Sequence, residues 1–472
     1  MNTINFIKEV ELKYDVKSIK VNNMEVWPFL RMAYCFAYNK KYNFNKEEVR
    51  ISLWAKIKRI GNIFYGFKNL FKKYDYVVFV SREDCKKLND NMHIDQFGDV
   101  LIHALSDKKT LLVEESRNIN LADIKKISYK NIISHDFFHF FGEFYFFNKN
   151  ILISNEYILK EINRKYKLNI KYKTKILKFL NYMKFYRRFF NFYKPKAIFM
   201  IDCYSLSHQS AIFAAQRMKI KTIEIQHGVI NDSHPAYNIF SELDRSFFPE
   251  YLLCFGNYVK KIFTDNNYFI KNKNVLAVGS MYIEYMNKEY QFPKKVIKLF
   301  RNFRKKYKKI ISVSAQVGTE NKLISFLKKS ANINDKDILY IFAPRNPDKD
   351  YSNIKFPPNI IILKNLNTYQ IIKQSDIHST LYSTCALEAP ALGVPNILIN
   401  IDGYAEKIYS KLLTNKDVTR FIETEEEFVS TILDWHPKSR NEIMNLHKDF
   451  YEKNHKKSLK IALGKIGINL KK

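Results

Sequence analysis

Short apolar runs that end in polar residues recur along the chain. The clearest lie at 75–80, 196–201, 222–225, 309–314, 338–342 and 396–399. Continuous apolar runs of this length are typical of strands that are buried on both faces of a parallel sheet. Helical segments at 205–218 and 384–392 lie between such runs. The pattern therefore predicts an α/β protein built from parallel sheets.

The stretch from His378 to Pro395 reads HSTLYSTCALEAPALGVP. We interpret the apolar runs 360–363 and 396–399 as strands and 384–392 as a helix between them. Ser383 and Thr384 would then lie at a helix start, where unpaired backbone N–H groups and the helix dipole favour a phosphate. Glu388, one turn further on, can accept hydrogen bonds from a pair of sugar hydroxyls. The alternative is an ordinary capped helix in an α/β core.

This stretch also resembles a known family. The run STCALEAPALGVP is similar to the nucleotide-binding segment of two-domain GT-B glycosyltransferases and of their relatives, the UDP-N-acetylglucosamine 2-epimerases. In those families the small polar turn meets the pyrophosphate and the glutamate meets the ribose. The resemblance therefore implies donor-binding roles for Ser383, Thr384 and Glu388.

A second motif follows the run 222–225, which ends at Gln226-His227-Gly228. Functional residues gather at the carboxyl ends of parallel strands. His227 titrates near neutral pH and is the best candidate for a general base, and Gly228 allows a sharp turn or close approach to a ligand. With the following His234-Pro235-Ala236-Tyr237, the motif resembles the capsular-polysaccharide and glycerophosphotransferase branch of GT-B proteins. The resemblance places Gln226, Gly228 and His234 on the acceptor side; the alternative is a structural histidine.

Two further loops complete the predicted donor site. The run 309–314 leads into a turn that contains Gly318 and Thr319, and such a turn can receive phosphate oxygens. The run 338–342 leads into Ala343-Pro344-Arg345, where many relatives carry a His-Pro pair. The missing histidine puts its usual role in doubt. Arg345 can replace it, because a guanidinium offers paired donors to a phosphate.

The N-terminal part gives weaker signals. A polar loop enters a helix near 91–102 and resembles a loop that follows the first strand in bacterial surface-polysaccharide biosynthesis proteins. The resemblance implies that His93 and Asp95 are candidate acceptor-side residues, with Asp95 a second candidate for the base. The alternative is that this loop only caps the helix. Trp27-Pro28 and Arg31 follow a predicted hairpin and resemble the opening of bacterial surface-polysaccharide biosynthesis proteins. We expect this opening to act as a structural cap on the N-terminal domain.

The charge balance needs an anionic neighbour or a reason to be tolerated. The chain has 79 Lys and Arg against 47 Asp and Glu, a net charge of +32. Between Arg164 and Arg188 there are basic residues and no acidic ones, interleaved with apolar residues at helical spacing. Residues 164–190 are therefore a candidate for contact with an anionic inner-membrane surface, or a solvated basic face over a core seam. RNA is a third option, but no RNA-binding motif accompanies the segment, so no nucleic acid partner is expected.

Other segments bear on location and cofactors. The aromatic run 137–147 is either a core helix or a lipid-facing surface, and we favour the core. Five scattered cysteines, the lack of a signal sequence and the lack of a long apolar run indicate a reduced, cytoplasmic protein, with any membrane contact peripheral. No Asp-x-Asp triplet ends a strand of the N-terminal half, so we infer no catalytic metal and no cofactor beyond the donor.

Together these features predict a GT-B-like fold of two Rossmann-like doubly wound domains facing each other across a cleft, with helical additions. The expected bounds are 1–255, 256–450, and a basic helix at 451–472 that crosses back to the first domain. The predicted function is metal-independent transfer of a sugar from a nucleotide-sugar donor to a saccharide or lipid-linked saccharide of a surface polysaccharide, such as capsule or lipopolysaccharide. The alternatives are a polyol-phosphate transferase, a nucleotide-sugar epimerase, and a non-catalytic basic scaffold that binds membrane or RNA.

Overall fold

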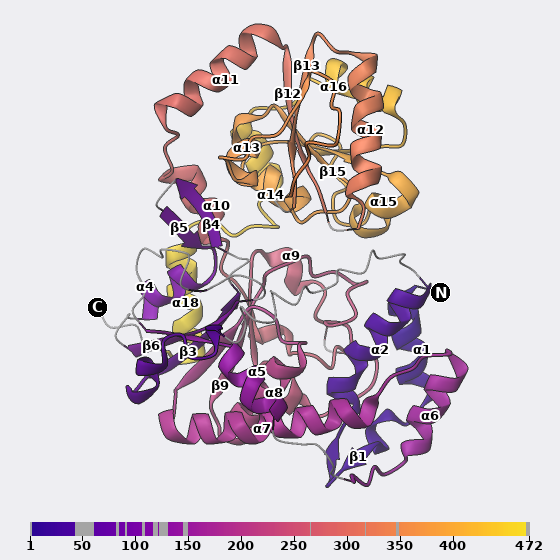
Figure 1. Cartoon of the computed structure of the whole chain (residues 1–472), viewed down its shortest axis with the longest axis vertical. Coiled ribbons are helices and arrows are strands. Elements are labelled where there is room, and N and C mark those ends of the chain that lie inside the picture. The colour runs from indigo at the N-terminus through magenta and orange to yellow at the C-terminus, as the bar shows by residue number, and fades with distance from the viewer. Residues whose placement is uncertain are drawn as a thin grey trace. The chain divides into compact units, whose positions relative to one another are not determined.

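The chain forms two compact units in the computed structural model (Figure 1). The structure describes residues 2–42, 61–81, 85–89, 92–105, 109–116, 121, 131–144, 150–264, 266–316, 318–345 and 349–468. The first unit comprises Met1–Lys86, Asn91–Val278 and Lys456–Lys472, and the second comprises Lys87–Asp90 and Gly279–His455.

The first unit is built on a parallel sheet whose strand order, in its described part, is β11-β10-β9-β8-β3-β6-β7. The strands are β3 (Tyr76–Ser81), β6 (Thr110–Glu115), β7 (Ile132–Ser134), β8 (Ala197–Met200), β9 (Lys221–Ile225), β10 (Tyr251–Cys254) and β11 (Val275–Ala277). The chain winds outward from β3 to β7 and then returns to the other side of β3 with β8. The sheet is therefore doubly wound, and its order reverses between β3 and β8.

Helices and a small hairpin accompany this sheet. The helices are α1 (Thr3–Lys13), α2 (Trp27–Tyr42), α4 (Gly98–Leu105), α5 (Asp136–Phe144), α6 (Glu156–Lys165), α7 (Tyr172–Tyr193), α8 (Leu206–Arg217), α9 (Asn257–Lys260) and α18 (His455–Ile466). Strands β1 (Lys20–Val21) and β2 (Met24–Glu25) form the hairpin that the sequence predicts before α2. Strands β4 (Cys85–Asn89) and β5 (Met92–Asp95) form another two-stranded pair.

The second unit repeats the same plan with the order β14-β13-β12-β15-β16-β17, again with parallel neighbours. Its strands are β12 (Lys309–Ser314), β13 (Ile338–Ala343), β14 (Ile360–Ile361), β15 (Ile377–Thr380), β16 (Asn396–Ile399) and β17 (Thr419–Ile422). The helices are α10 (Met281–Lys288), α11 (Lys294–Lys306), α12 (Glu320–Ile333), α13 (Thr368–Gln374), α14 (Cys385–Ala391), α15 (Tyr404–Tyr409), α16 (Glu425–Asp434) and α17 (Arg440–Leu446). The order reverses between β12 and β15.

The strands form where the apolar runs predict them, because both faces of each sheet are covered. In the second unit Ile311, Val313, Phe342 and Ile397 are fully buried in one core together with residues of α12 and α16. Figure 1 shows these two helices beside β12 and β13. The expected fold class of two Rossmann-like doubly wound units is thus confirmed by the two strand orders.

Two expectations about organisation are corrected. The sequence places the domain boundary at 255/256, but β10 and β11 pair with β9 in the first sheet, so the first unit continues to Val278. The sequence also takes 360–363 as the strand that directly precedes α14. The structure instead has α13 and the strand β15 in between. The final helix, α18, belongs to the first unit, where the sequence places it.

The basic segment 164–190 is mostly the helix α7. Several of its apolar residues, including Ile176, Phe179 and Phe190, are buried, and α7 packs against α5 and α8. Basic residues such as Lys184 and Arg187 remain exposed. The apolar face is therefore occupied by the core, which favours the interpretation as a solvated basic face over a core seam.

The aromatic run 137–147 is described only in part. Phe138 is fully buried in α5 and stacks on Tyr186 with a centroid distance of 4.9 Å, as the core interpretation requires. Phe140 is 36% exposed. Residues 145–147 lie outside the described residues. Among the described residues, no helix is both long and apolar enough to cross a bilayer.

Candidate active site

Most of the residues that the sequence selects follow strands of the two parallel sheets, at the carboxyl ends of those strands. In the second unit the strand order reverses between β12 and β15, so the loops after these strands diverge above the sheet. In the first unit the strand order reverses between β3 and β8. Such a switch point is where open α/β sheets leave room for a ligand. We describe each edge separately.

The loop after β12 is shaped by a glycine. Gly318 has φ +86, a left-handed conformation that disfavours residues with a Cβ, and open space lies where its Cβ would be. The next residue, Thr319, is buried and is the N-cap residue of α12. Gly318 and Thr319 thus form the strand-to-helix turn that the sequence predicts at this edge.

The loop after β15 brings Ser383 and Thr384 to the start of α14. The Cys385 amide donates to Ser383 Oγ at 3.3 Å, and the Ser383 amide donates to Thr380 Oγ1 at 3.3 Å. The Tyr409 hydroxyl donates to the carbonyl oxygen of Ser383 at 2.7 Å and so holds the loop from the opposite side. Thr384 is half-buried and makes no capping bond with its side chain, so its hydroxyl can turn toward a ligand.

Glu388 is oriented by a tyrosine from the neighbouring helix. The Tyr369 hydroxyl, from α13, donates to Glu388 Oε1 at 2.7 Å. Burial, and then the Glu388 carboxylate, raise the pKa of Tyr369 well above its usual value, so this hydroxyl stays protonated. Tyr282 packs edge-on against Tyr369 with a centroid distance of 4.8 Å. The half-buried carboxylate therefore has a fixed direction one turn into α14, as the sequence predicts.

A polar row inside the sheet supports this loop. His378 is fully buried in β15, with Nε2 2.8 Å from Ser314 Oγ on β12 and Nδ1 2.8 Å from Asn396 Oδ1 on β16. Burial lowers the pKa of His378 to about 4, so the ring is neutral. Asn396 Nδ2 donates to the carbonyl oxygen of Ala386, which would otherwise lack a partner because Pro390 has no N–H. The row thus ties β12, β15 and β16 to α14.

Arg345 lies at the same edge. It is exposed and follows β13 by two residues, next to the end of β12, because the Ala315 amide donates to the Ala343 carbonyl at 3.0 Å. Residues 346–348 lie outside the described residues. The position agrees with a phosphate-facing arginine, and that role stays a prediction.

In the first unit, the Gln-His-Gly motif directly follows β9. Gln226 is buried and braces the loop: its Nε2 donates to the Gly228 carbonyl at 2.8 Å, and its Oε1 accepts from the Phe255 amide at 2.8 Å. His227 is half-buried, with Nε2 3.2 Å from the Tyr204 hydroxyl. Gly228 does not have a positive φ, and no atom lies within 4 Å of where its Cβ would be. It leaves space beside His227 rather than supplying a special turn.

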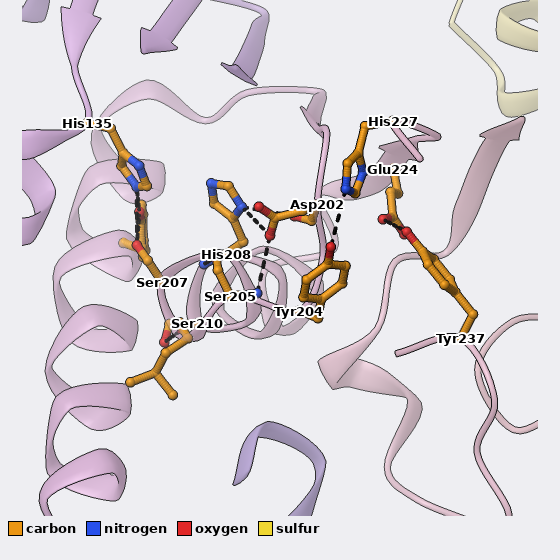
Figure 2. Close-up of polar contacts among 12 residues, drawn as sticks. His135, Asp202, Tyr204, Ser205, Ser207, His208, Ser210, Glu224, His227 and Tyr237 are labelled. Atoms are coloured by element: carbon orange, nitrogen blue, oxygen red, sulfur yellow. Dashed lines mark hydrogen bonds and ion pairs between the residues drawn. The ribbon is translucent and has the colours of Figure 1, made fainter. Parts of the chain in front are cut away.

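An ion pair that the sequence analysis missed lies next to His227. Asp202 follows β8, and its Oδ1 is 3.0 Å from His208 Nδ1, one turn into α8 (Figure 2). The pairing holds the pKa of Asp202 well below its usual range and raises the pKa of His208, although burial acts against each of these two shifts. The charge of His227 also favours the Asp202 carboxylate. Asp202 therefore stays ionised between two histidines.

The signal for this pair is the spacing Asp-x-x-Ser-x-x-His after a strand. Ser205 is the N-cap residue of α8 and accepts from the His208 amide, while Asp202 Oδ1 accepts from the Ser205 amide at 3.2 Å. This cap brings His208 back over Asp202, as Figure 2 shows.

His234 is held by the N-terminal cap. Arg31, buried in α2, pairs with Glu11 at 2.8 Å and donates to the Asn238 carbonyl at 2.8 Å. Glu11 Oε2 also accepts from the Phe240 amide at 2.8 Å. Burial, then His227 and Arg31, lower the pKa of His234 to about 4, so it is neutral. The Trp-Pro-x-x-Arg opening thus has the structural role that we expect, and it fixes the loop that follows Gln-His-Gly.

Asp95 has a local role in the structure. Its Oδ1 accepts from the amides of Phe97 at 2.9 Å and Gly98 at 2.8 Å, which caps α4. This cap accounts for an aspartate at the position, as the alternative interpretation of the loop proposed. Its role as a base stays a prediction. His93 lies in β5, and its side chain lies outside the described residues.

In contrast to Asp202, a second acidic residue near this edge is kept neutral by burial. Glu224, in β9, is fully buried and accepts from the Tyr237 hydroxyl at 2.7 Å. Burial raises the pKa of Glu224 to about 8. Figure 2 shows Glu224 and Tyr237 beside Tyr204 and His227. Within the described residues, no group of three or more His, Cys, Asp or Glu side chains has the arrangement of a metal site.

Comparisons with known proteins give matches among solved structures. No protein-family model matches the sequence, and no curated protein matches it. The UDP-GlcNAc 2-epimerase of Methanocaldococcus jannaschii, crystallised with UDP-GlcNAc and UDP, is 13% identical with a TM-score of 0.47, over 83% of this chain and 99% of that one.

Two glycosyltransferases show a similar degree of likeness. The calicheamicin glycosyltransferase CalG4 is 10% identical with a TM-score of 0.47, over 84% of this chain and 100% of that one. A glycosyltransferase from Rickettsia africae is 15% identical with a TM-score of 0.45, over 84% and 99%. Solved structures similar to this chain thus include both classes that the sequence resembles, glycosyltransferases and UDP-GlcNAc 2-epimerases.

Proposed function

We propose that the protein is a metal-independent transferase that uses a nucleotide-activated sugar. The observation that carries the proposal is the Tyr369-held carboxylate of Glu388, one turn beyond Ser383 and Thr384 at the switch point of a doubly wound sheet. A carboxylate fixed at this distance from a helix start suits a ligand with hydroxyls at one end and phosphates at the other. A nucleotide is such a ligand.

The donor would bind to the second unit. Glu388 accepts from the ribose hydroxyls, while the amides and hydroxyls of Ser383 and Thr384 and the Gly318-Thr319 turn receive the diphosphate. Arg345, at the adjacent strand end, adds a positive charge to the departing phosphate. These groups stabilise the negative charge that develops on the leaving group, which is where electrostatic catalysis has its largest effect.

The acceptor would be activated in the first unit. His227 takes the proton of an acceptor hydroxyl, whose oxygen then attacks the anomeric carbon. The new carbon–oxygen bond forms as the bond between that carbon and the diphosphate breaks, and the bonding electron pair leaves with the diphosphate. Asp202 stabilises the protonated His227, and the Tyr204 hydroxyl positions its ring. In this account Asp202, and not Asp95, is the carboxylate that assists the base.

The resemblance to polysaccharide-biosynthesis proteins suggests the acceptor class: a saccharide or lipid-linked saccharide of a capsule or lipopolysaccharide, reached from the cytoplasm. The second candidate is transfer of a polyol phosphate, in which the same base activates the hydroxyl and the attack falls on phosphorus. The Gln-His-Gly motif supports this second candidate, because it resembles the motif of the glycerophosphotransferase branch. An epimerase ranks lower, because residues 400–406 lack the Thr-Glu-Arg-Pro-Glu run of those enzymes.

A donor screen tests the proposal. Purified protein is heated with UDP-, CMP-, CDP- and GDP-linked donors, and the change in Tm is measured beside Glu388→Ala. We expect one donor class to raise the Tm of the wild type by several degrees, since a bound ligand stabilises the folded state. The shift should vanish in Glu388→Ala and persist in the exposed control Glu426→Ala. No shift with any donor, together with salt-sensitive binding to vesicles or RNA, would favour the scaffold instead.

A further inference from the structure

A row of exposed phenylalanines precedes β3 in the first unit. Phe64, Phe67 and Phe71 are 63%, 43% and 72% exposed. Their rings are neighbours, with centroids 6.3 Å apart between the first two and 5.5 Å apart between the last two. Single exposed apolar residues are normal, but a contiguous group indicates a contact surface. We call residues 64–73 the aromatic–lysine surface.

The backbone of this surface is fixed to the edge strand β7. Gly66 has φ +74, and a Cβ there would lie 1.8 Å from the Ile132 carbonyl oxygen. Asn69 Nδ2 donates to the same oxygen at 3.0 Å, and the Ser134 amide donates to the Tyr65 carbonyl at 3.2 Å. The Asn69 side chain and the Tyr65 carbonyl therefore face β7, and the phenylalanines are exposed on a backbone that these bonds hold in place.

Helix α7 supports the end of the same surface. The Tyr193 hydroxyl donates to the carbonyl oxygen of Leu70, and the Tyr193 ring lies 5.8 Å from that of Tyr74. The preceding residue, Phe192, is 60% exposed. A fourth exposed phenylalanine thus belongs to the element that anchors the aromatic–lysine surface.

The charge of this surface is positive, and its lysines form no ion pair with the described residues. Lys68, Lys72 and Lys73 are exposed, and residues 61–74 contain no acidic residue. Lys72 Nζ donates to the side-chain oxygens of Asn69 and Asn131, both at 3.1 Å, and these amides are uncharged. The nearest acid in sequence, Asp75, pairs with Lys109 and Lys196.

We propose that the aromatic–lysine surface docks the protein on an anionic lipid bilayer. Phenylalanine rings enter the boundary between headgroups and acyl chains, while the lysine ammonium groups contact lipid phosphates. Single-stranded nucleic acid can also contact lysines and stacked aromatic rings. The sequence carries no nucleic-acid-binding motif, so a bilayer is the partner that this combination of exposed rings and lysines favours. The inference is independent of the proposed transferase activity.

Two other basic helices serve as contrasts. In α7 the apolar face is packed in the core. Helix α11 is basic along its length, with no acidic residue, but Val296 and Phe300 are buried and only Ile297 of its large apolar residues is more than 36% exposed. Both offer charge without a row of exposed rings, so their variants measure what net charge alone contributes.

The test is co-sedimentation of the full chain with phosphatidylcholine vesicles that contain or lack phosphatidylglycerol. The change of Lys68, Lys72 and Lys73 to Gln should weaken binding to the anionic vesicles roughly a hundredfold, because each lysine near an anionic membrane surface contributes about 1 kcal/mol of binding free energy. The change of Phe64, Phe67 and Phe71 to Ser should weaken it more than about tenfold, although the net charge is unchanged. Tm values of the variants confirm that they fold.

The matched control changes Lys294, Lys295 and Lys298 of α11 to Gln, which removes the same charge. We expect this variant to bind almost as the wild type does. The proposal is overturned if the wild type does not bind anionic vesicles, if the serine variant binds like the wild type, or if both lysine variants weaken binding equally. The last result would mean attraction by net charge alone.

Discussion

Glu224 is a buried carboxyl group whose surroundings favour its protonated form. Its pKa rises from an ordinary value of 4.5 to about 8 in the folded protein. Between these two values the folded state binds more protons than the unfolded state, so stability falls as the pH rises. Glu224→Gln stays neutral and can still accept from Tyr237. We therefore expect the variant to be more stable than the wild type at pH 8, by on the order of 3 kcal/mol.

The measurement for Glu224 is the Tm of both proteins across this pH window. The Tm of the wild type should decline with pH more steeply than that of Glu224→Gln, and the exposed control Glu426→Gln should follow the wild type. Parallel curves for the wild type and Glu224→Gln would contradict the inference that Glu224 is protonated in the fold.

At the scale of single residues, the sequence indicates candidate site residues where the residue type is unusual for the position. His227 and Glu388 stand out at a strand end and within a helix start, and the structure places both at a sheet edge. Asp202 and His208 escaped notice, because each is ordinary near a helix cap. Their pairing depends on the fold of the cap around Ser205, which the spacing permits but does not require.

At the scale of elements, the buried pair Arg31–Glu11 joins α1 and α2 to the loop 235–240. Both side chains are at most 1% exposed. Removal of one partner leaves a buried charge without its counterion, which costs about 3–5 kcal/mol. Arg31→Met should therefore lower the Tm strongly and loosen the loop that carries His234.

The control for Arg31 is Arg217→Met, whose ion pair with Asp244 is exposed. Such pairs contribute roughly 0–1 kcal/mol, so the Tm of this variant should scarcely change. If Arg31→Met were as stable as Arg217→Met, the N-terminal cap would not hold the loop as we describe.

Strands could be predicted from the sequence where their buried residues are apolar. Strands β12 and β16 have the bounds that the apolar runs give, β13 differs by one residue at one end, and β3 and β8 differ by one residue at both ends. Strand β15 was misread because three of its four residues, His378, Ser379 and Thr380, are polar. These polar side chains can be buried because each forms a hydrogen bond with a neighbouring strand. Such bonds between strands cannot be recognised from the sequence of one segment.

At the scale of the whole molecule, the alternation of strands and helices predicted two doubly wound units. The boundary was placed too early, because β10 and β11 look like the start of a new sheet until their pairing with β9 is known. The arrangement of the units across a cleft stays a prediction, and so does the meeting of donor and base in one reaction.

The most direct test of that joint action is hydrolysis of the donor identified by thermal shift, measured as release of the free nucleotide. The account predicts that His227→Gln keeps the donor-induced rise in Tm but loses roughly 10²–10⁴ in kcat, the usual contribution of a general base. Glu388→Ala should lose both the thermal shift and the hydrolysis. A His227→Gln variant that releases nucleotide at the wild-type rate would contradict the claim that the histidine of the first unit acts on a donor held by the second.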